Sequence, residues 1–379
     1  MPMTATEPDG ATASSRFDRR RLLAGAAACG VLAFSQLPGR SAAAPPLPRF
    51  AATAAARDGG FALCLIDGDG RISRQVALPG RGHGFAWHAA SGRLTAFARR
   101  PDRFAVALDG ADAAPRRFDA PEGRHFYGHG VFSADGRILY ACENDYDGAR
   151  GVVGLYDATA GYARLGELET GGIGPHQIDW LPDGRTLVVA NGGIETHPDY
   201  GRTKLNLPTM EPSVVLLDSG SGRLAAQDAL PAKLHQLSLR HLAVDAKGRA
   251  WIGGQYEGPK ADLPPLLAVF DPATGRLAAL EMPPALSARY RSYVGSVMAS
   301  GDGRLVATSS PRGSIVTLWD IATLQPLAHH EIEDVCGLAA WGEGFLATGG
   351  GGDLVHLTRA GATTVGRHAL HWDNHALAL

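Results

Sequence analysis

The stretch "PHQIDWLPDGRTLVVANG" (175–192) contains two short apolar runs that are separated by Asp183-Gly184. An Asp-Gly pair between two apolar runs is the strongest short-range signal for a β-hairpin. His176 stands at the start of the first run, among positions that otherwise hold Ile, Trp, Leu and Val. The stretch therefore predicts a strand pair whose first strand begins with an imidazole.

The same pattern recurs along the chain. Similar units occupy residues 82–99, 128–145, 240–257, 294–311 and 336–352, and the chain ends on "NHALAL" (374–379). A third apolar strand and a less apolar fourth strand follow each pair, so that a unit of four strands returns every ~40–50 residues. Short strands at this period, without helical periodicity, are typical of β-propeller blades.

The repeats predict an all-β fold of the WD40/YVTN-like type, a seven-bladed β-propeller. Six units begin cleanly, and the seventh blade is expected to be composite. Residues 50–79 supply three of its strands and "HALAL" (375–379) supplies the fourth. Pairing the N-terminal strands with the C-terminal strand closes the ring and removes the free edges that an open sheet would expose. Residues 44–379 are thus expected to form a single domain.

The N-terminal residues 1–43 are predicted to be a twin-arginine (Tat) export signal. Arg19-Arg20-Arg21 precedes the apolar run 24–37, and small residues follow at 41–44. Paired arginines, a short apolar run and small residues before a cleavage site are typical of such signals. The alternative is a basic patch beside a buried helix. Export by this route predicts a periplasmic protein, and the apolar run is too short to leave a membrane span in the mature chain.

Composition narrows the classes of partner and cofactor. The chain carries a formal net charge of −2 and has no run of Lys or Arg beyond residue 21, which argues against a nucleic-acid partner. No CxxCH motif is present, so covalent haem attachment is not expected. Cys64, Cys142 and Cys336 lie far apart in the sequence and are expected to be buried free thiols.

Aligning the units places a histidine at the start of five of the seven innermost strands. The aligned position holds Gly295 and Gly337 in the other two blades. The five histidines come from blades that are consecutive around the ring, and they are predicted to form an arc at one mouth of the central channel: His83, His129, His176, His241 and His375.

Long polar loops are expected on the same face. They are predicted at 143–151, 191–212 and 255–265, because the loop entering the first strand and the loop joining the second and third strands share one face of a propeller. Polar, irregular loops over such a mouth are where ligand binding is expected. The candidate ligand-binding residues are Glu143, Asn144, Asn191, His197, Arg202, Lys204, Asn206, Gln255, Tyr256, Asp373 and Asn374.

Neutral imidazole is the commonest metal ligand in proteins and suits iron, copper, zinc and nickel. The arc therefore predicts a site that binds a metal ion or an anion. A structural role is the alternative, since each histidine could instead hydrogen-bond an adjacent loop and wedge two blades together.

Several long stretches resemble a known family. The segments 128–157, 171–218 and 239–259 and the C-terminal "HWDNHALAL" (371–379) are similar to a family of Tat-exported propellers of unknown function. Members are encoded beside imelysin-type periplasmic proteins and a di-haem oxidoreductase in iron-responsive clusters. The resemblance implies a periplasmic role in iron acquisition and a periplasmic partner of one of these two kinds. Apart from Asp373, the candidate residues given above match the family's recurrent motifs.

Three functions remain open from the sequence. The first, which the arc and the family resemblance together favour, is an accessory protein that binds a metal (iron or copper) or a metal complex at the histidine arc. The second is a platform without chemistry of its own that binds an imelysin-like partner through its loops. The third is a metal-dependent enzyme of the lactonase or redox type, which rests on fold-level analogy.

Overall fold

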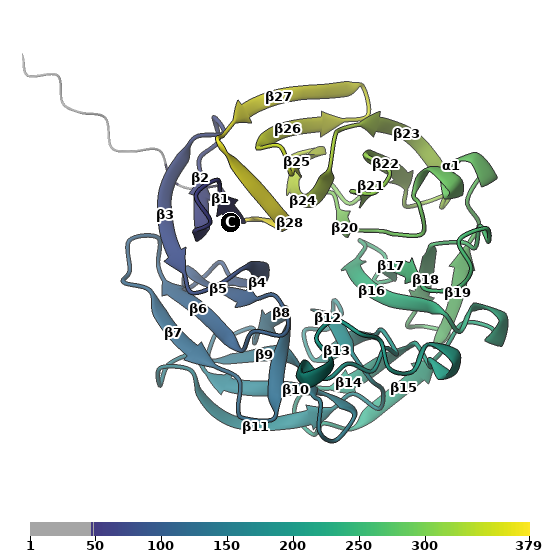
Figure 1. Ribbon diagram of the computed structural model, residues 1–379, viewed down its shortest axis with the longest axis horizontal. Helices are drawn as coiled ribbons and strands as arrows, with labels where there is room; N and C mark the ends of the chain where they lie inside the picture. The colour runs from purple at the N-terminus through teal and green to yellow at the C-terminus, as the bar shows by residue number, and fades with distance from the viewer. Residues whose placement is uncertain (1–46, 48) are drawn as a thin grey trace, which may run out of the picture. The chain divides into compact units, whose positions relative to one another are not determined.

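The chain folds into seven four-stranded antiparallel sheets arranged in a ring (Figure 1). The computed structural model describes residue 47 and residues 49–379. The seven-bladed propeller expected from the repeats is confirmed. The predicted export signal and its boundary at residues 43 and 44 lie outside the described residues.

The blades follow one another along the chain, and each is built from the innermost strand outward. The first three are β4 (Gly82–His88), β5 (Arg93–Ala98), β6 (Phe104–Asp109), β7 (Arg116–Asp119); β8 (Arg124–Phe132), β9 (Ile138–Asp145), β10 (Arg150–Asp157), β11 (Ala163–Glu169); and β12 (Pro175–Trp180), β13 (Thr186–Asn191), β14 (Ser213–Asp218), β15 (Leu224–Asp228). The next three are β16 (Leu237–Val244), β17 (Ala250–Tyr256), β18 (Leu267–Asp271), β19 (Arg276–Leu280); β20 (Ser296–Ala299), β21 (Leu305–Ser310), β22 (Ile315–Asp320), β23 (Pro326–Glu331); and β24 (Val335–Trp341), β25 (Gly344–Gly349), β26 (Asp353–Thr358), β27 (Gly361–Arg367).

The seventh blade joins the two ends of the propeller. It contains β28 (Leu370–Ala378), β1 (Phe50–Ala56), β2 (Phe61–Ile66) and β3 (Ile72–Leu78) in that order. Phe50 pairs with Ala378 and Ala52 with Ala376 in an antiparallel ladder. The predicted closure of the ring by the C-terminal strand is confirmed, and β28 takes the innermost position of its blade.

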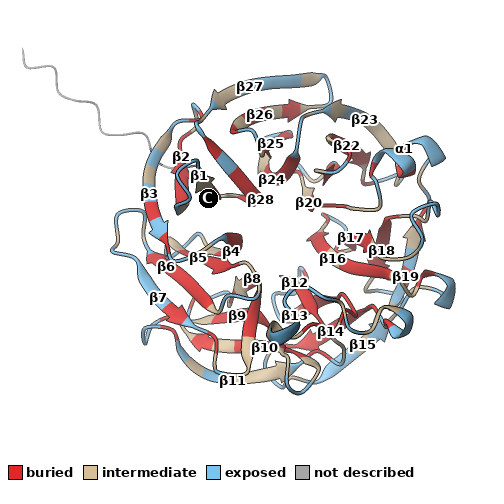
Figure 2. Ribbon diagram, viewed as in Figure 1, coloured by how far each residue is buried: buried red, intermediate tan, exposed pale blue. Residues whose placement is uncertain are grey.

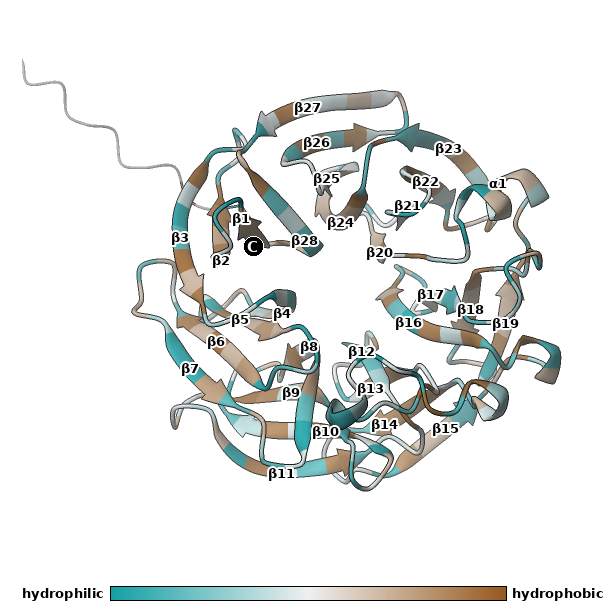
Figure 3. Ribbon diagram, viewed as in Figure 1, coloured by the Kyte–Doolittle hydropathy of each residue, from teal (hydrophilic) through white to brown (hydrophobic). Residues whose placement is uncertain are grey.

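The core lies between neighbouring blades. Figure 2 shows buried residues concentrated on the inner and middle strands and exposed residues on the outer ones. Figure 3 shows hydrophilic segments on the outer strands β3, β7 and β23. Trp251 and Trp319, from adjacent blades, are both fully buried, with ring centroids 6.5 Å apart. Apolar faces that stack between blades explain how a chain of this length forms one ring.

Most innermost strands carry an irregularity at the same level. The pairing register with the second strand shifts in β4, β8, β12, β16, β24 and β28. In β12, for example, Pro175 pairs with Asn191 and Gln177 with Ala190, which leaves His176 as the extra residue. A β-bulge of this kind bends the strand and redirects a side chain.

The connecting loops partly follow the prediction. The expected loop at 143–151 is shorter than predicted, because Glu143, Asn144 and Asp145 continue β9 and pair with β10, which leaves only residues 146–149 outside the ladder. The long connections 192–212 and 257–266 are present. Short 3-10 helices lie at Pro198–Tyr200, Leu207–Thr209 and Ala232–Leu234, and α1 (Pro284–Arg289) precedes β20.

Cys64, Cys142 and Cys336 are buried and unpaired, which confirms the expectation of free thiols. A search of the described residues finds no helix that is both long and apolar enough to cross a membrane.

Candidate functional site

The five predicted histidines come together in one buried cluster. His83, His129, His176, His241 and His375 lie on β4, β8, β12, β16 and β28, and none is more than 8% exposed. The ring centroids of His129 and His375 are 4.6 Å apart, and those of His176 and His241 are 4.7 Å apart. We call this group the histidine cluster.

The β-bulges explain how regular strands turn five imidazoles towards one another. His83, His129, His176 and His375 lie within the register shifts of their strands, and His241 follows the extra residue Arg240 directly. A side chain on an unbroken strand would point to one face of the blade and pack against the next blade. The bulge interrupts the alternation of side chains between the two faces of the strand, so that the histidine points in another direction.

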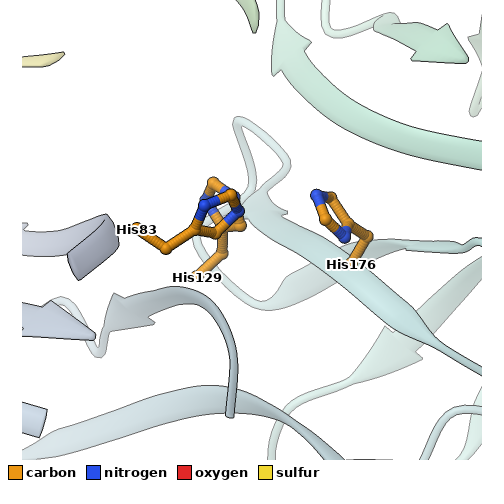
Figure 4. A group of neighbouring side chains, drawn as sticks. All are labelled: His83, His129 and His176. Carbon is orange, nitrogen blue, oxygen red and sulfur yellow. The ribbon is translucent and has the colours of Figure 1, made fainter. Parts of the chain in front are cut away.

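Two overlapping groups of the cluster have the arrangement of metal ligands. One contains His83, His129 and His176, and the other contains His129, His241 and His375. Within each group, one nitrogen from each ring lies within 4.8 Å of the others. Figure 4 shows the side chains of the first group, whose rings are turned towards one another. His129 is common to both groups.

Many ring nitrogens of the cluster have no hydrogen-bond partner among the described residues. Both nitrogens of His83 and of His241 are buried and unpartnered, as is Nε2 of His129, His176 and His375. Buried polar atoms are nearly always hydrogen-bonded in native proteins, and an unsatisfied one costs about 1–3 kcal/mol. Seven such atoms in one cluster indicate that something other than a protein group is meant to contact them.

The cluster is neutral at physiological pH. Burial, followed by the nearby histidines, holds the pKa values of His83, His176 and His241 well below the ordinary value of 6.5. Burial lowers the pKa of His129 in the same way, and lowers that of His375 to about 3, with a further contribution from Arg99. Neutral imidazole keeps the lone pair that a metal requires.

The geometry is compatible with a metal ion after a small movement. Metal–nitrogen bonds of about 2.0–2.1 Å in a tetrahedral site place the nitrogens about 3.4 Å apart. The nitrogens here lie within 4.8 Å of one another, so a closure of at most about 1–1.5 Å, within reach of ring rotations, would complete either group. Three protein ligands leave a further coordination position open, as in catalytic and transport sites.

A cavity of about 410 Å³ lies over the cluster, with His83 and His176 in its lining. Three of the residues predicted to bind a ligand also line it: Arg202, Gln255 and Asn374. The structure therefore brings residues from a long loop and from the last blade together above the histidines.

The other predicted ligand-binding residues lie outside the lining of this cavity. Asn144 contacts His125 Nε2 and the Thr196 carbonyl, and His197 caps the 3-10 helix that follows it. Other members of the set form local contacts: Asn191 with Thr170 and Ser213, Lys204 with Glu257, Asn206 with Glu195 and Gly193, Tyr256 with Asp262, and Asp373 with Arg81.

Glu143 is placed in a buried network of its blade. Tyr156 donates a hydrogen bond to its carboxylate, and Arg164 Nη2 lies 3.1 Å from Oε2. Arg124 Nη1 lies 3.8 Å from the same oxygen. These contacts give Glu143 the geometry of a residue that ties strands together within the blade.

Two kinds of site residue escaped the sequence analysis. The first is arginine, because five further arginines join Arg202 in the lining of the cavity: Arg81, Arg99, Arg100, Arg240 and Arg312. Their position beside the histidine-bearing strands was a usable signal, since Arg81 and Arg240 lie within two residues of His83 and His241. The second is the glycine that flanks a histidine in "GHG" at 82–84 and at 128–130.

These glycines allow the imidazoles to approach. A Cβ on Gly84 would lie 2.5 Å from the Gly128 carbonyl oxygen and 2.8 Å from Cε1 of His129. Gly128 has a φ of +99°, a conformation that side-chain-bearing residues rarely adopt, and a Cβ there would overlap His83.

Gly84→Ala is expected to lower the free energy of unfolding by about 1–3 kcal/mol, because the added methyl overpacks the cluster. Chemical denaturation would measure this. The matched control is Gly166→Ala on β11, where a Cβ meets no atom within 4 Å and no positive φ is required. Equal stability of the two variants would contradict the close packing described here.

Comparisons with known proteins agree with the fold. A chain of Kuenenia stuttgartiensis hydrazine synthase is similar with a TM-score of 0.57 at 14% identity, over 88% of this chain and 99% of that one. A chain of a mitotic checkpoint complex gives a TM-score of 0.57 at 12% identity, over 78% and 82%. At such identities the likeness shows the fold alone. No curated protein matches the sequence significantly. Residues 76–379, however, match a family defined by sequence, and the chain therefore belongs to the family described as "Protein of unknown function (DUF1513)".

Proposed function

We propose that this propeller binds one ion of iron or copper through three imidazoles of the histidine cluster and serves as an accessory protein of metal acquisition. The observation that carries the proposal is the set of seven buried ring nitrogens without a hydrogen-bond partner among the described residues. An ion held by three rings can satisfy up to three of these atoms directly, because each neutral ring offers one lone pair.

A purely structural role accounts less well for the cluster. A histidine that wedges two blades would use its ring nitrogens to hydrogen-bond them. His330, on the outer strand β23 of one blade, does this with the carbonyl of Thr358 on β26 of the next blade. Apolar side chains would fill the same volume without the cost of burying unpaired polar atoms.

The donor set favours a borderline or soft ion. Each candidate group consists of nitrogen ligands alone, and imidazole suits copper, ferrous iron, zinc and nickel better than it suits hard cations such as Mg²⁺ and Ca²⁺. Two groups that share His129 also allow an ion to move between two positions, a property suited to transfer.

The cellular setting rests on the sequence. The predicted twin-arginine signal favours a periplasmic protein, and the family resemblance favours iron acquisition with an imelysin-like or di-haem protein as partner. The long loop at 192–212 contributes Arg202 to the lining of the cavity and offers such a partner a surface next to the metal.

The test is metal uptake by the tag-free protein. After stripping and desalting, the protein is expected to bind close to one Cu(II), or one Fe(II) under anaerobic conditions, per chain, measured by calorimetry and elemental mass spectrometry. The His129→Ala/His176→Ala variant should bind neither. Failure of the unaltered protein to take up either ion, or unchanged uptake by the variant, would refute the proposal.

A further inference from the structure

The cavity over the histidine cluster carries a concentrated positive charge. Six guanidinium groups line it, from Arg81, Arg99, Arg100, Arg202, Arg240 and Arg312. They come from three blades and from the long loop after β13, so that sequence-distant segments converge on one space. We call this space the arginine cavity.

Negative charge within the described part of the lining is small. Asp334 is the one acidic residue of the lining, and the neighbouring Asp373 is ion-paired with Arg81. Glu257, the carboxylate that acts on Arg240, is already ion-paired with Lys204. Arg99 and Arg100 form no ion pair with a described residue. Several guanidinium charges of the cavity therefore lack a counter-charge from the described protein.

The positively charged arginines of the cavity repel one another in the absence of an anion. Arg99, Arg100 and Arg240 are half-buried, and burial together with neighbouring arginines lowers their pKa values, to about 10 for Arg100. Like charges held together in this way destabilise the folded state unless an anion joins them. Guanidinium is also the group that best matches carboxylate and phosphate, through paired hydrogen bonds.

The histidines provide a second, independent indication of a ligand. His83 and His176 line the same cavity, are more than nine-tenths buried, and have Nε2 atoms without a partner among the described residues. Unsatisfied nitrogen ligands thus lie next to unsatisfied cations. A free metal cation that entered through this cavity would be repelled by the arginines, whereas a metal carried by a polyanion would be attracted.

We propose that the arginine cavity binds a small polycarboxylate anion and that the histidine cluster receives its metal as the complex of that anion. The delivery of the metal as a complex rests on the proposed function, whereas the binding of the anion rests on the cavity alone. Two or more carboxylates pair with the guanidinium groups, and the metal that they chelate faces His83 and His176. The cavity volume of about 410 Å³ is in the range of small-molecule sites.

The first experiment titrates trisodium citrate into the metal-free, tag-free protein by calorimetry. The metal is stripped with 1,10-phenanthroline, since EDTA is itself a polycarboxylate. Citrate is expected to bind, and Arg100→Gln/Arg240→Gln is expected to weaken it by about 100-fold or more, because two charge-assisted contacts are lost. The control Arg185→Gln/Arg304→Gln removes the same charge from exposed turns elsewhere and should bind citrate normally.

The folding of the variant provides an internal check. Removing two mutually repelling charges should leave the free energy of unfolding unchanged or higher, so weak citrate binding by a stable Arg100→Gln/Arg240→Gln protein identifies a ligand site. Three results would overturn the polycarboxylate assignment. The unaltered protein could fail to bind citrate, the two double variants could bind citrate equally well, or inorganic phosphate could bind more tightly than citrate.

The second experiment separates this inference from the proposed metal function. Citrate should still bind metal-free His129→Ala/His176→Ala, because the arginines remain. The Cu(II)–citrate complex should bind the unaltered protein more tightly than citrate alone, and this gain should disappear in the histidine variant. Simple Cu(II) or Fe(II) salts could instead bind tightly through the histidines, with no effect of citrate. That result would overturn delivery of the metal by an anion, and the proposed metal site would still stand.

Discussion

His129→Ala is expected to lower the affinity for the metal by about 100-fold or more, a larger loss than for any other single histidine of the cluster. The reason is that His129 belongs to both candidate ligand groups, so that its removal leaves neither complete. Loss of a group that only orients a metal ligand already costs about 10–100-fold in affinity, and loss of the ligand itself should cost at least as much. Calorimetric titration with Cu(II) would measure the effect.

Paired variants identify the group that holds the ion. His83→Ala/His176→Ala removes the first group and leaves His129, His241 and His375, whereas His241→Ala/His375→Ala does the reverse. If either group can hold the ion, each pair variant should retain binding through the group left intact, whereas loss of binding in one pair alone would identify that group as the metal site. His235→Ala/His329→Ala, which removes two histidines outside the cluster, is the matched control. Retention of full affinity by His129→Ala would exclude both groups.

Acid is expected to destabilise the metal-free protein through the histidine cluster. The pKa of His375 is about 3 in the folded protein and close to 6.5 in the unfolded chain. The unfolded chain therefore binds the proton first, and the contribution of His375 to stability is complete above pH 6.5 and is lost as the pH falls. This one residue should cost about 2 kcal/mol by pH 5 and about 4 kcal/mol by pH 3.

The effect is measured as a difference between proteins. Burial raises the pKa of Asp179 to about 6, which increases stability as the pH falls and opposes the histidines. Comparing the unaltered protein with His375→Gln between pH 7 and pH 5 cancels this contribution. The free energy of unfolding should fall more steeply in the unaltered protein, because only its unfolded chain gains a proton on residue 375. Equal slopes would mean that His375 is protonated in the folded state.

Much of the architecture follows from local sequence. Asp183-Gly184 and its counterparts set the hairpins, and the C-terminal "HALAL" predicts the strand that closes the ring. The alignment of the units also predicts which histidines share one entrance. Glu143 shows the limit of such reasoning: its polar neighbourhood suggests a loop, whereas strand pairing extends through it and Tyr156 and Arg164 hold its carboxylate.

The sequence by itself determined the number of blades, the composite seventh blade and the position of five histidines on consecutive innermost strands, because hairpin signals and repeats are local. Only the tertiary structure decided that the imidazoles point towards one another and that six arginines from distant segments line one cavity above them. Side-chain direction depends on β-bulges in the innermost strands that carry the histidines, and a bulge is a property of pairing between two strands. The arginines meet in one cavity only because the seven blades close into a ring, and the sequence of a single repeat does not contain that closure.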